Sequence, residues 1–186
     1  MAVDDTLQDA EQKMKGAVSV TQDELGSIRT GRANPKLLDR VTVDYYGTRV
    51  PLRDLAGFSV PEPRLLVIQP YDRNAMAAME KAIMSSDLGL TPSNDGNVIR
   101  LSFPPLTEER RKDLIKLAHE RVEEGRVSVR NVRRHAKETL ERLERDHTIS
   151  QDDLHRAEQQ LQKLTDQFVS EMDKLLEHKE KDLMEV

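Results

Sequence analysis

The strongest constraint on this fold is a pair of long stretches whose apolar residues recur every three or four positions. One follows Pro104 and Pro105 and runs to about residue 145, and the other runs from about residue 150 to the end of the chain. This spacing places one apolar stripe along a helix that packs at a shallow angle against its neighbours. Each helix would be roughly 50–60 Å long, because an α-helix rises about 1.5 Å per residue.

The two stretches also carry signals for where each helix begins. Thr107 and Ser150 are each followed by two acids, as expected of N-cap residues at the positive end of a helix dipole. The polar segment 146–150 between the stretches is short enough for an antiparallel hairpin. The predicted apolar stripes consist of Leu114, Ala118, Val122, Gly125, Val129, Val132, Ala136, Leu140 and Leu143 in the first stretch, and of Leu154, Ala157, Leu161, Leu164, Phe168, Met172, Leu175 and Lys179 in the second.

A third amphipathic stretch lies at the N-terminus. Its apolar line consists of Leu7, Ala10, Met14, Ala17, Thr21, Leu25 and Ile28. Because a two-helix hairpin leaves one apolar face uncovered, this helix can cover it, and we expect an elongated three-helix bundle. Gly16 and Gly125 lie inside predicted helices at a cost of about 1 kcal/mol each relative to Ala, which marks close packing or local bending.

The middle of the chain has a different pattern. Residues 41–46, 64–70 and 97–103 are β-branched or alternating and are bounded by Gly, Pro and Asn, which predicts three strands. A short helix is expected over residues 73–86, before a turn rich in Gly and Asn. The fold class is therefore α+β: a small α/β domain (31–105) inserted into a helical bundle (1–30 and 106–186).

An inserted domain requires the chain to cross between the two domains twice. We expect the crossings near residues 29–32 and 104–106, with Thr30, Gly31, Pro104, Pro105 and Leu106 as hinge residues. Gly31 gives the first crossing more backbone freedom, whereas the two prolines restrict the backbone of the second crossing. A hinge is one interpretation and a rigid elbow is the other, and the sequence leaves both open.

Several classes of function find no support in the sequence. There is no cysteine, no glycine-rich phosphate loop, and no pair of histidines at the spacing that a helical metal site needs. The longest apolar run, residues 65–68, is far too short to span a membrane, and no signal peptide is evident. We therefore expect a cytoplasmic, monomeric protein with no cofactor, metal or catalytic activity.

Charge is segregated along the last two predicted helices. The net charge is −5, yet residues 126–145 hold seven basic groups against three acids, and residues 146–186 hold eleven acids against five bases. Local charge decides where a polyanion can dock. Four of the basic groups share one helical face, and two further arginines near the first crossing could extend it. These candidate site residues are Arg126, Arg130, Arg133, Arg134, Arg29 and Arg32.

Arginine side chains suit bidentate contacts with phosphate, so this face is a candidate nucleic-acid interface. The alternative is a solvated face with intrahelical ion pairs, such as Arg134 with Glu138. The residues alone do not decide between the two.

Five segments resemble the ribosome recycling factor family and occur in that family's order and spacing. They are SIRTGRANP (27–35), VDYYG (43–47), SDLGLTPSNDG (86–96), PPLTEERRKDL (104–114) and VSVRNVRR (127–134). The resemblance covers essentially the whole chain. It implies the fold expected above, a long three-helix bundle with an inserted α/β domain on a two-strand hinge.

The resemblance, and not the periodicity, also implies a function. Such factors bind the post-termination ribosome with the bundle against large-subunit ribosomal RNA. With elongation factor G and that partner's GTP hydrolysis, they promote subunit separation and release of mRNA and tRNA. The resemblance assigns RNA contact to Arg130, Arg133 and Arg134, with Arg29 and Arg32 near the hinge, and makes Arg133 the first candidate.

Two other classes of function remain open from the residues alone. A coiled-coil adapter or chaperone would use the bundle to hold protein and would show an exposed apolar groove or stable oligomers. An enzyme would have its site in the inserted domain, around Tyr45, Tyr46 and Asp95, although no motif supports this.

Overall fold

The computed structural model describes residues 2–185 and divides into two units. A helical unit consists of the residues up to Leu25 together with Lys112–Asp182, and an α/β unit consists of Gly26–Arg111 together with the residues from Leu183 onward. Helix α1 (Ala2–Gly26) precedes the α/β unit in the chain, and helices α4 (Glu108–Arg145) and α5 (Gln151–Met184) follow it. The predicted hinge segments 29–32 and 104–106 both lie in the stretch of chain assigned to the α/β unit.

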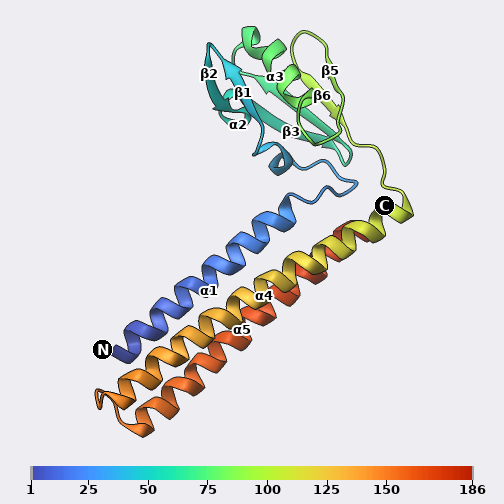
Figure 1. Ribbon diagram of the computed structural model, residues 1–186. Helices are drawn as coiled ribbons and strands as arrows, with labels where there is room; N and C mark the ends of the chain where they lie inside the picture. Colours follow the sequence, from blue (N-terminus) through green and yellow to red (C-terminus); the bar gives the residue numbers. More distant parts are fainter. Residues whose placement is uncertain (1, 186) are drawn as a thin grey trace. The chain divides into compact units, whose positions relative to one another are not determined.

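In the helical unit, three long helices pack along one another (Figure 1). They approach closely at Gly125 of α4, where an added Cβ would meet Thr21 Oγ1 of α1 and lie 2.9 Å from Met172 Cε of α5. Of the two interpretations given for Gly125, close packing or local bending, the structure therefore supports close packing. Gly16, by contrast, has open space around the position of a Cβ. The buried stripe predicted for α4 is confirmed for Leu114, Ala118, Val122, Gly125, Val129, Ala136 and Leu140.

The predicted N-caps of α4 and α5 are confirmed. Thr107 Oγ1 accepts a hydrogen bond from the Arg110 amide at 3.2 Å. Ser150 Oγ accepts one from the Asp153 amide at 3.1 Å and donates one to Asp153 Oδ2 at 2.7 Å, so the two residues cap each other. Such reciprocal capping satisfies amides that have no partner within the helix.

Three details of the predicted stripes are wrong, and one of them is Leu164 of α5, which is only partly buried whereas its neighbour Thr165 is buried. Helix α1 ends at Gly26, so Ile28 is buried outside the helix rather than on its apolar line. Near the C-terminal end of α5, Leu176 is buried, whereas the predicted Leu175 is only partly buried. Both residues fit a spacing of three or four from Met172, and only the position of the neighbouring helices selects between them.

The α/β unit contains a two-stranded and a four-stranded antiparallel sheet. Strands β1 (Thr42–Tyr45) and β2 (Thr48–Pro51) form a hairpin, with Tyr45 opposite Thr48. The larger sheet has the order β3-β4-β6-β5, built from β3 (Ala56–Glu62), β4 (Leu65–Pro70), β6 (Ile99–Ser102) and β5 (Pro92–Asn94). The short helices are η1 (Pro35–Leu38), α2 (Leu52–Leu55), η2 (Arg73–Ala75) and α3 (Met76–Met84).

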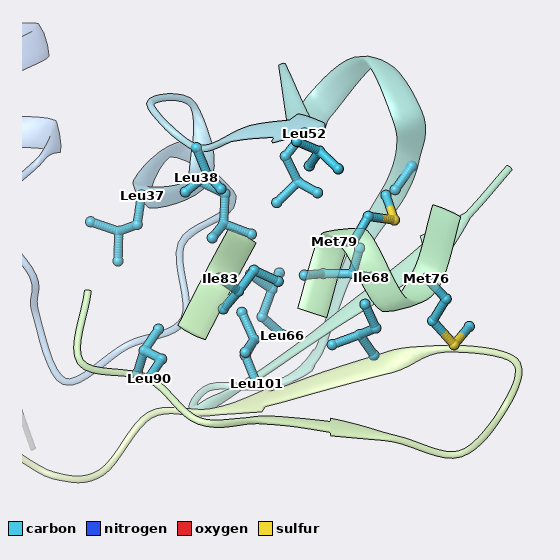
Figure 2. Close-up of a cluster of buried hydrophobic side chains, with 14 of the residues drawn as sticks. Leu37, Leu38, Leu52, Leu66, Ile68, Met76, Met79, Ile83, Leu90 and Leu101 are labelled. Carbon is cyan, nitrogen blue, oxygen red and sulfur yellow. The ribbon is translucent and has the colours of Figure 1, made fainter. Parts of the chain in front are cut away.

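The core of the α/β unit lies between α3 and the sheets. Met79 and Ile83 of α3 point toward Leu66 and Ile68 of β4 and Leu101 of β6, and all five are fully buried (Figure 2). The strand predictions for residues 41–46, 64–70 and 97–103 correspond to β1, β4 and β6. The helix expected over 73–86 is wrong in extent, because it is divided into η2 and the shorter α3.

Strands β2, β3 and β5 were not expected from the sequence. Each contains proline, and β3 also contains glycine, both of which weaken a strand signal. The strands form nevertheless because β3 and β5 are the two edges of the larger sheet, where an amide hydrogen can be missing from one side.

The turn between β1 and β2 has an unusual backbone. Tyr46 has φ 51° and Gly47 has φ 81°, so both residues of this two-residue turn are left-handed. The twist of a hairpin favours such turns, which normally carry Asn-Gly or Gly-Gly. A tyrosine in this conformation costs roughly 1–2 kcal/mol.

Candidate nucleic-acid interface

The arginines of α4 flank its buried stripe on the side of α5. Val129 and Ala136 are buried between the helices, and Arg126 and Arg133 are seven residues apart at the edge of this contact. His119, seven residues before Arg126, contacts Glu180 of α5 at the same edge. Steps of seven residues return to nearly the same side of a helix, so these side chains meet α5 at successive levels.

Arg126 is committed to contacts within the helical unit. Its Nε donates to Asp173 Oδ1 of α5 at 3.0 Å and its Nη1 donates to Glu123 Oε2 at 3.1 Å, and only 19% of its side chain is exposed. Burial alone would lower the pKa of Arg126, but the hydrogen bonds to Asp173 and Glu123 outweigh it and raise the pKa. The same bond from Arg126 lowers the pKa of Glu123. Arg126 therefore acts first as a clamp between α4 and α5.

Arg133 uses part of its hydrogen-bonding capacity in a contact with α5. Its Nη1 donates to the side-chain oxygen of Gln162 on α5, and the Gln162 amide donates in turn to Asp166 at 2.8 Å. The side chain is half-buried at the edge between the two helices. A guanidinium carries five N–H donors, so Arg133 retains others for an anion.

Arg130 and Arg134 are the most available of the four. Arg130 donates to Glu123 at 3.2 Å, with 55% of its side chain exposed. Arg134 is exposed and forms no ion pair or side-chain hydrogen bond with any residue from 2 to 185. The predicted intrahelical pair of Arg134 with Glu138 is therefore not formed, whereas Arg126 and Arg130 both pair with Glu123 of the same helix.

Arg29 and Arg32 belong to the α/β unit. Arg29 Nη2 donates to the carbonyl of Pro104 at 3.4 Å, and its guanidinium lies 6.0 Å from the centre of the Phe103 ring. Burial, followed by the nearby charge of Arg110, lowers the pKa of Arg29. Arg32 is exposed and forms an ion pair with Glu185. Arg29 thus joins the two predicted hinge segments to each other.

The predicted hinge residues lie outside helices and strands. Thr30 is buried, and its Oγ1 accepts a hydrogen bond from the Arg32 amide at 3.3 Å. Gly31 has open space where a Cβ would project. Pro104 and Pro105 are exposed and Leu106 is half-buried, in the segment between β6 and α4.

The sequence analysis did not identify the residues that pair with the arginines of α4. Glu123 was detectable, because it precedes Arg126 by three residues on the same helix. Asp173 and Gln162 were not, because their approach to α4 depends on how α5 is aligned along it. The step of seven from His119 to Arg126 and Arg133 was a usable signal that these residues face a neighbouring helix.

The residues that an enzyme in the inserted domain would need do not come together. Tyr45 and Tyr46 contact Asp72, whereas Asp95 accepts from the amides of Asn97 and Val98 and from Arg100. Among residues 2–185, no three His, Asp or Glu side chains are grouped so that they could hold a metal ion. Within the same residues, every helix is too short or too polar to cross a membrane.

Comparison with known proteins identifies the family. Residues 21–184 match the family described as "Ribosome recycling factor". The chain belongs to the ribosome recycling factor family. The resemblance drawn from the five sequence segments is thereby confirmed.

Relatives of the ribosome recycling factor family match along nearly the whole chain. The ribosome-recycling factor of Acidothermus cellulolyticus is 52% identical over 184 residues, covering 99% of this chain and 100% of its own length. That of Rubrobacter xylanophilus is 55% identical over 180 residues, covering 97% of each chain.

Solved structures of ribosome recycling factors also match. A solution structure of a ribosome recycling factor has a TM-score of 0.81 at 47% identity, covering 100% of this chain and 99% of the other. A second has a TM-score of 0.71 at 44% identity and covers 100% of both chains. It is described as models for the T. thermophilus ribosome recycling factor and the E. coli elongation factor G bound to the E. coli post-termination complex. The expected fold class, a helical bundle with a small α/β domain, is confirmed.

Proposed function

We propose that this protein recycles ribosomes after termination. It binds the post-termination ribosome and, with elongation factor G and GTP hydrolysis by that partner, promotes subunit separation and release of mRNA and tRNA. The proposal is supported by full-length similarity to ribosome-recycling factors and by the related structure described with elongation factor G. The protein works as a cytoplasmic monomer and contributes binding and motion rather than catalysis.

The surface that docks on large-subunit ribosomal RNA is formed by Arg130, Arg133 and Arg134 of α4. The observation that carries this proposal is the state of Arg134, an exposed cation with no partner among residues 2–185. Arg130 lies one helical turn away and is more than half exposed. Two solvated guanidinium groups on one edge, with donors of Arg133 beside them, provide the bidentate chemistry that phosphate groups favour.

Arg126 takes a smaller part in RNA binding. To reach a phosphate it would have to leave Asp173, and that carboxylate would then lose its charged partner in α4. We therefore assign to Arg126 the task of holding α4 against α5, so that the neighbouring arginines keep a fixed spacing.

The crossings between the two units form a hinge in this proposal. Segments 29–32 and 104–106 have no regular structure, and Gly31 meets no neighbour that would restrain it. Arg29 ties the two segments together through Phe103 and Pro104, so they move as a pair. The hinge lets the α/β unit swing when elongation factor G acts on the anchored protein.

Sedimentation with vacant ribosomes tests the docking surface. Wild type should pellet with the large subunit, and Arg133→Ala and Arg134→Ala should each weaken binding by about tenfold, which corresponds to roughly 1.4 kcal/mol. Gln162→Ala is the matched control, because it removes the partner of Arg133 without removing the cation. It should bind as wild type does.

Thermal melts of the same variants separate binding from folding. Arg134→Ala should melt as wild type does, whereas Arg126→Ala should lose about 1 kcal/mol of stability with a smaller loss of binding. If Arg133→Ala and Arg134→Ala both pellet like wild type, the arginine surface is not the docking site. If wild type itself does not bind ribosomes, the proposed function fails.

A further inference from the structure

Two adjacent tyrosines lie beside one carboxylate, that of Asp72. Tyr45 ends β1, Tyr46 follows it in the turn, and Tyr71 directly precedes Asp72 after β4. The Tyr45 hydroxyl donates to Asp72 Oδ2 at 2.9 Å, and the Tyr46 hydroxyl approaches the same oxygen at 3.5 Å. We call Tyr46 and Asp72 the tyrosine patch.

The fold does not account for the tyrosine at position 46. The residue is 76% exposed, and its backbone is in a left-handed conformation that asparagine or glycine would adopt with less strain. Tyr45, in contrast, is half-buried and packs against the core of the α/β unit. Strained residues with exposed side chains concentrate at sites of function, and here the strain and the exposure coincide.

The Tyr46 ring is nevertheless held in place. It meets the Tyr45 ring edge to face, with centroids 4.6 Å apart, and its hydroxyl is near Asp72. Tyr71, which is also 76% exposed, is not part of this pair: its ring is near Gly57 of β3. Restrained tyrosines lose little conformational entropy on binding and present an apolar face with a polar tip, which is why they are enriched where proteins bind one another.

The charge of the patch indicates what it binds. The amide of Asn74 and then the hydroxyl of Tyr45 lower the pKa of Asp72, so its carboxylate is ionised at neutral pH. No arginine or lysine among residues 2–185 forms an ion pair with it. The face of an aromatic ring is also electronegative, so a ring beside a carboxylate that has no cationic partner attracts a cationic side chain and repels phosphate.

We propose that the tyrosine patch docks a basic segment of a protein partner, with an arginine or lysine seated against the ring of Tyr46 and paired with Asp72. This inference rests on the proposed function in one respect: the partner is a protein that the chain meets on the ribosome. It assigns to the α/β unit a recognition surface of opposite charge to the arginine surface of α4.

Tyr46→Asn separates recognition from folding. Asparagine tolerates the left-handed turn, so the variant should melt about 1–4 °C higher than wild type, while recycling with elongation factor G slows by about tenfold or more. If Tyr46 serves only the hairpin, the variant should instead melt at a lower temperature. If recycling is as fast as in wild type, the patch is not a docking surface.

Two matched variants test the chemistry. Tyr46→Phe keeps the ring and removes the hydroxyl, and recycling should remain within about twofold of wild type. Asp72→Asn removes the charge but keeps an oxygen that can accept from the Asn74 amide, as an asparagine N-cap does. It should slow recycling with little change in melting temperature. An unchanged rate of recycling would show that no cation of the partner pairs with Asp72.

A photoactivatable cross-linker at position 46 identifies the class of partner. In mixtures with post-termination ribosomes and elongation factor G, cross-links should form to protein and map beside a lysine or arginine. Cross-links to ribosomal RNA, or none above those of a linker at exposed Met84, would refute the proposal. Sedimentation of wild type with ribosomes is the separate check on the proposed function, so failure of the two ideas can be distinguished.

Discussion

At the scale of single residues, Gly125 shows how a missing side chain sets the distance between helices. A Cβ there would contact Thr21 of α1 and Met172 of α5, and both of these side chains are buried. The helix therefore accepts a poor helix former because three helices can then approach closely.

The pair Gly125→Ala and Gly16→Ala tests this explanation. Alanine is favoured over glycine by about 1 kcal/mol inside a helix, so Gly16→Ala, in open space, should stabilise the protein by up to about that amount. Gly125→Ala should instead destabilise it by about 1–3 kcal/mol through overpacking. Urea unfolding followed by circular dichroism measures both. Equal effects of the two substitutions would mean that packing at Gly125 is loose.

Among the arginines, the individual partners matter more than the shared helical face. Arg126 and Arg134 are eight residues apart on α4, yet one is paired with α5 and the other is exposed. Their positions in the sequence describe them as members of one cluster. The contacts of each residue divide the cluster into a structural part and a binding part.

At the scale of elements, the turn between β5 and β6 depends on an ionised carboxylate. Asp95 accepts hydrogen bonds from the amides of Val98 and Asn97 and from Arg100, and these, in that order, hold its pKa at about 2 instead of 3.8. Because the folded pKa is below the unfolded one, the stabilisation is complete above about pH 4 and is lost as the pH falls toward 2.

The variant Asp95→Asn should remove this pH dependence. Its side-chain oxygen can still accept from the two amides, but it carries no charge. Between pH 5 and pH 2, the melting temperature of the α/β unit should fall less steeply in the variant than in wild type. Parallel curves for the two proteins would show that Asp95 does not contribute to acid sensitivity.

At the scale of the whole molecule, the proposed docking surface predicts how salt affects binding. Each phosphate contact releases counterions, so the logarithm of ribosome affinity should fall linearly with the logarithm of salt concentration. Arg134→Ala should reduce the slope by about 1, because one contact is lost. Arg126→Ala should leave the slope almost unchanged. Titrations at several salt concentrations measure this, and equal slopes for all three proteins would argue against arginine–phosphate docking.

The proposed hinge makes a separate prediction. Gly31→Ala adds a Cβ in open space, so it should preserve the fold and stabilise it by about 0.4–1 kcal/mol. By restricting the backbone, it should slow recycling severalfold while ribosome binding stays the same. Gly16→Ala, in a helix, is the control. If Gly31→Ala recycles ribosomes as fast as that control, flexibility at residue 31 is not needed.

The sequence by itself determined the helices, their caps and the main strands of the α/β unit. Helical periodicity and the capping signals of Thr107 and Ser150 are local, because they depend on residues within one or two turns. The family was also accessible, since five segments carry it in order. The proline-containing strands β2, β3 and β5 were not, because a strand is stabilised by its partner across the sheet.

Only the tertiary structure decided which arginines of α4 are available for binding, and whether Leu175 or Leu176 of α5 is buried. Arg126 and Arg133 differ from Arg130 and Arg134 because α5 brings Asp173 and Gln162 beside the first two. Leu176 is buried instead of Leu175 for a related reason, namely the rotation of α5 against its neighbours. A helix repeats every 3.6 residues, so its own pattern leaves about one position of ambiguity, and only contacts between helices remove it.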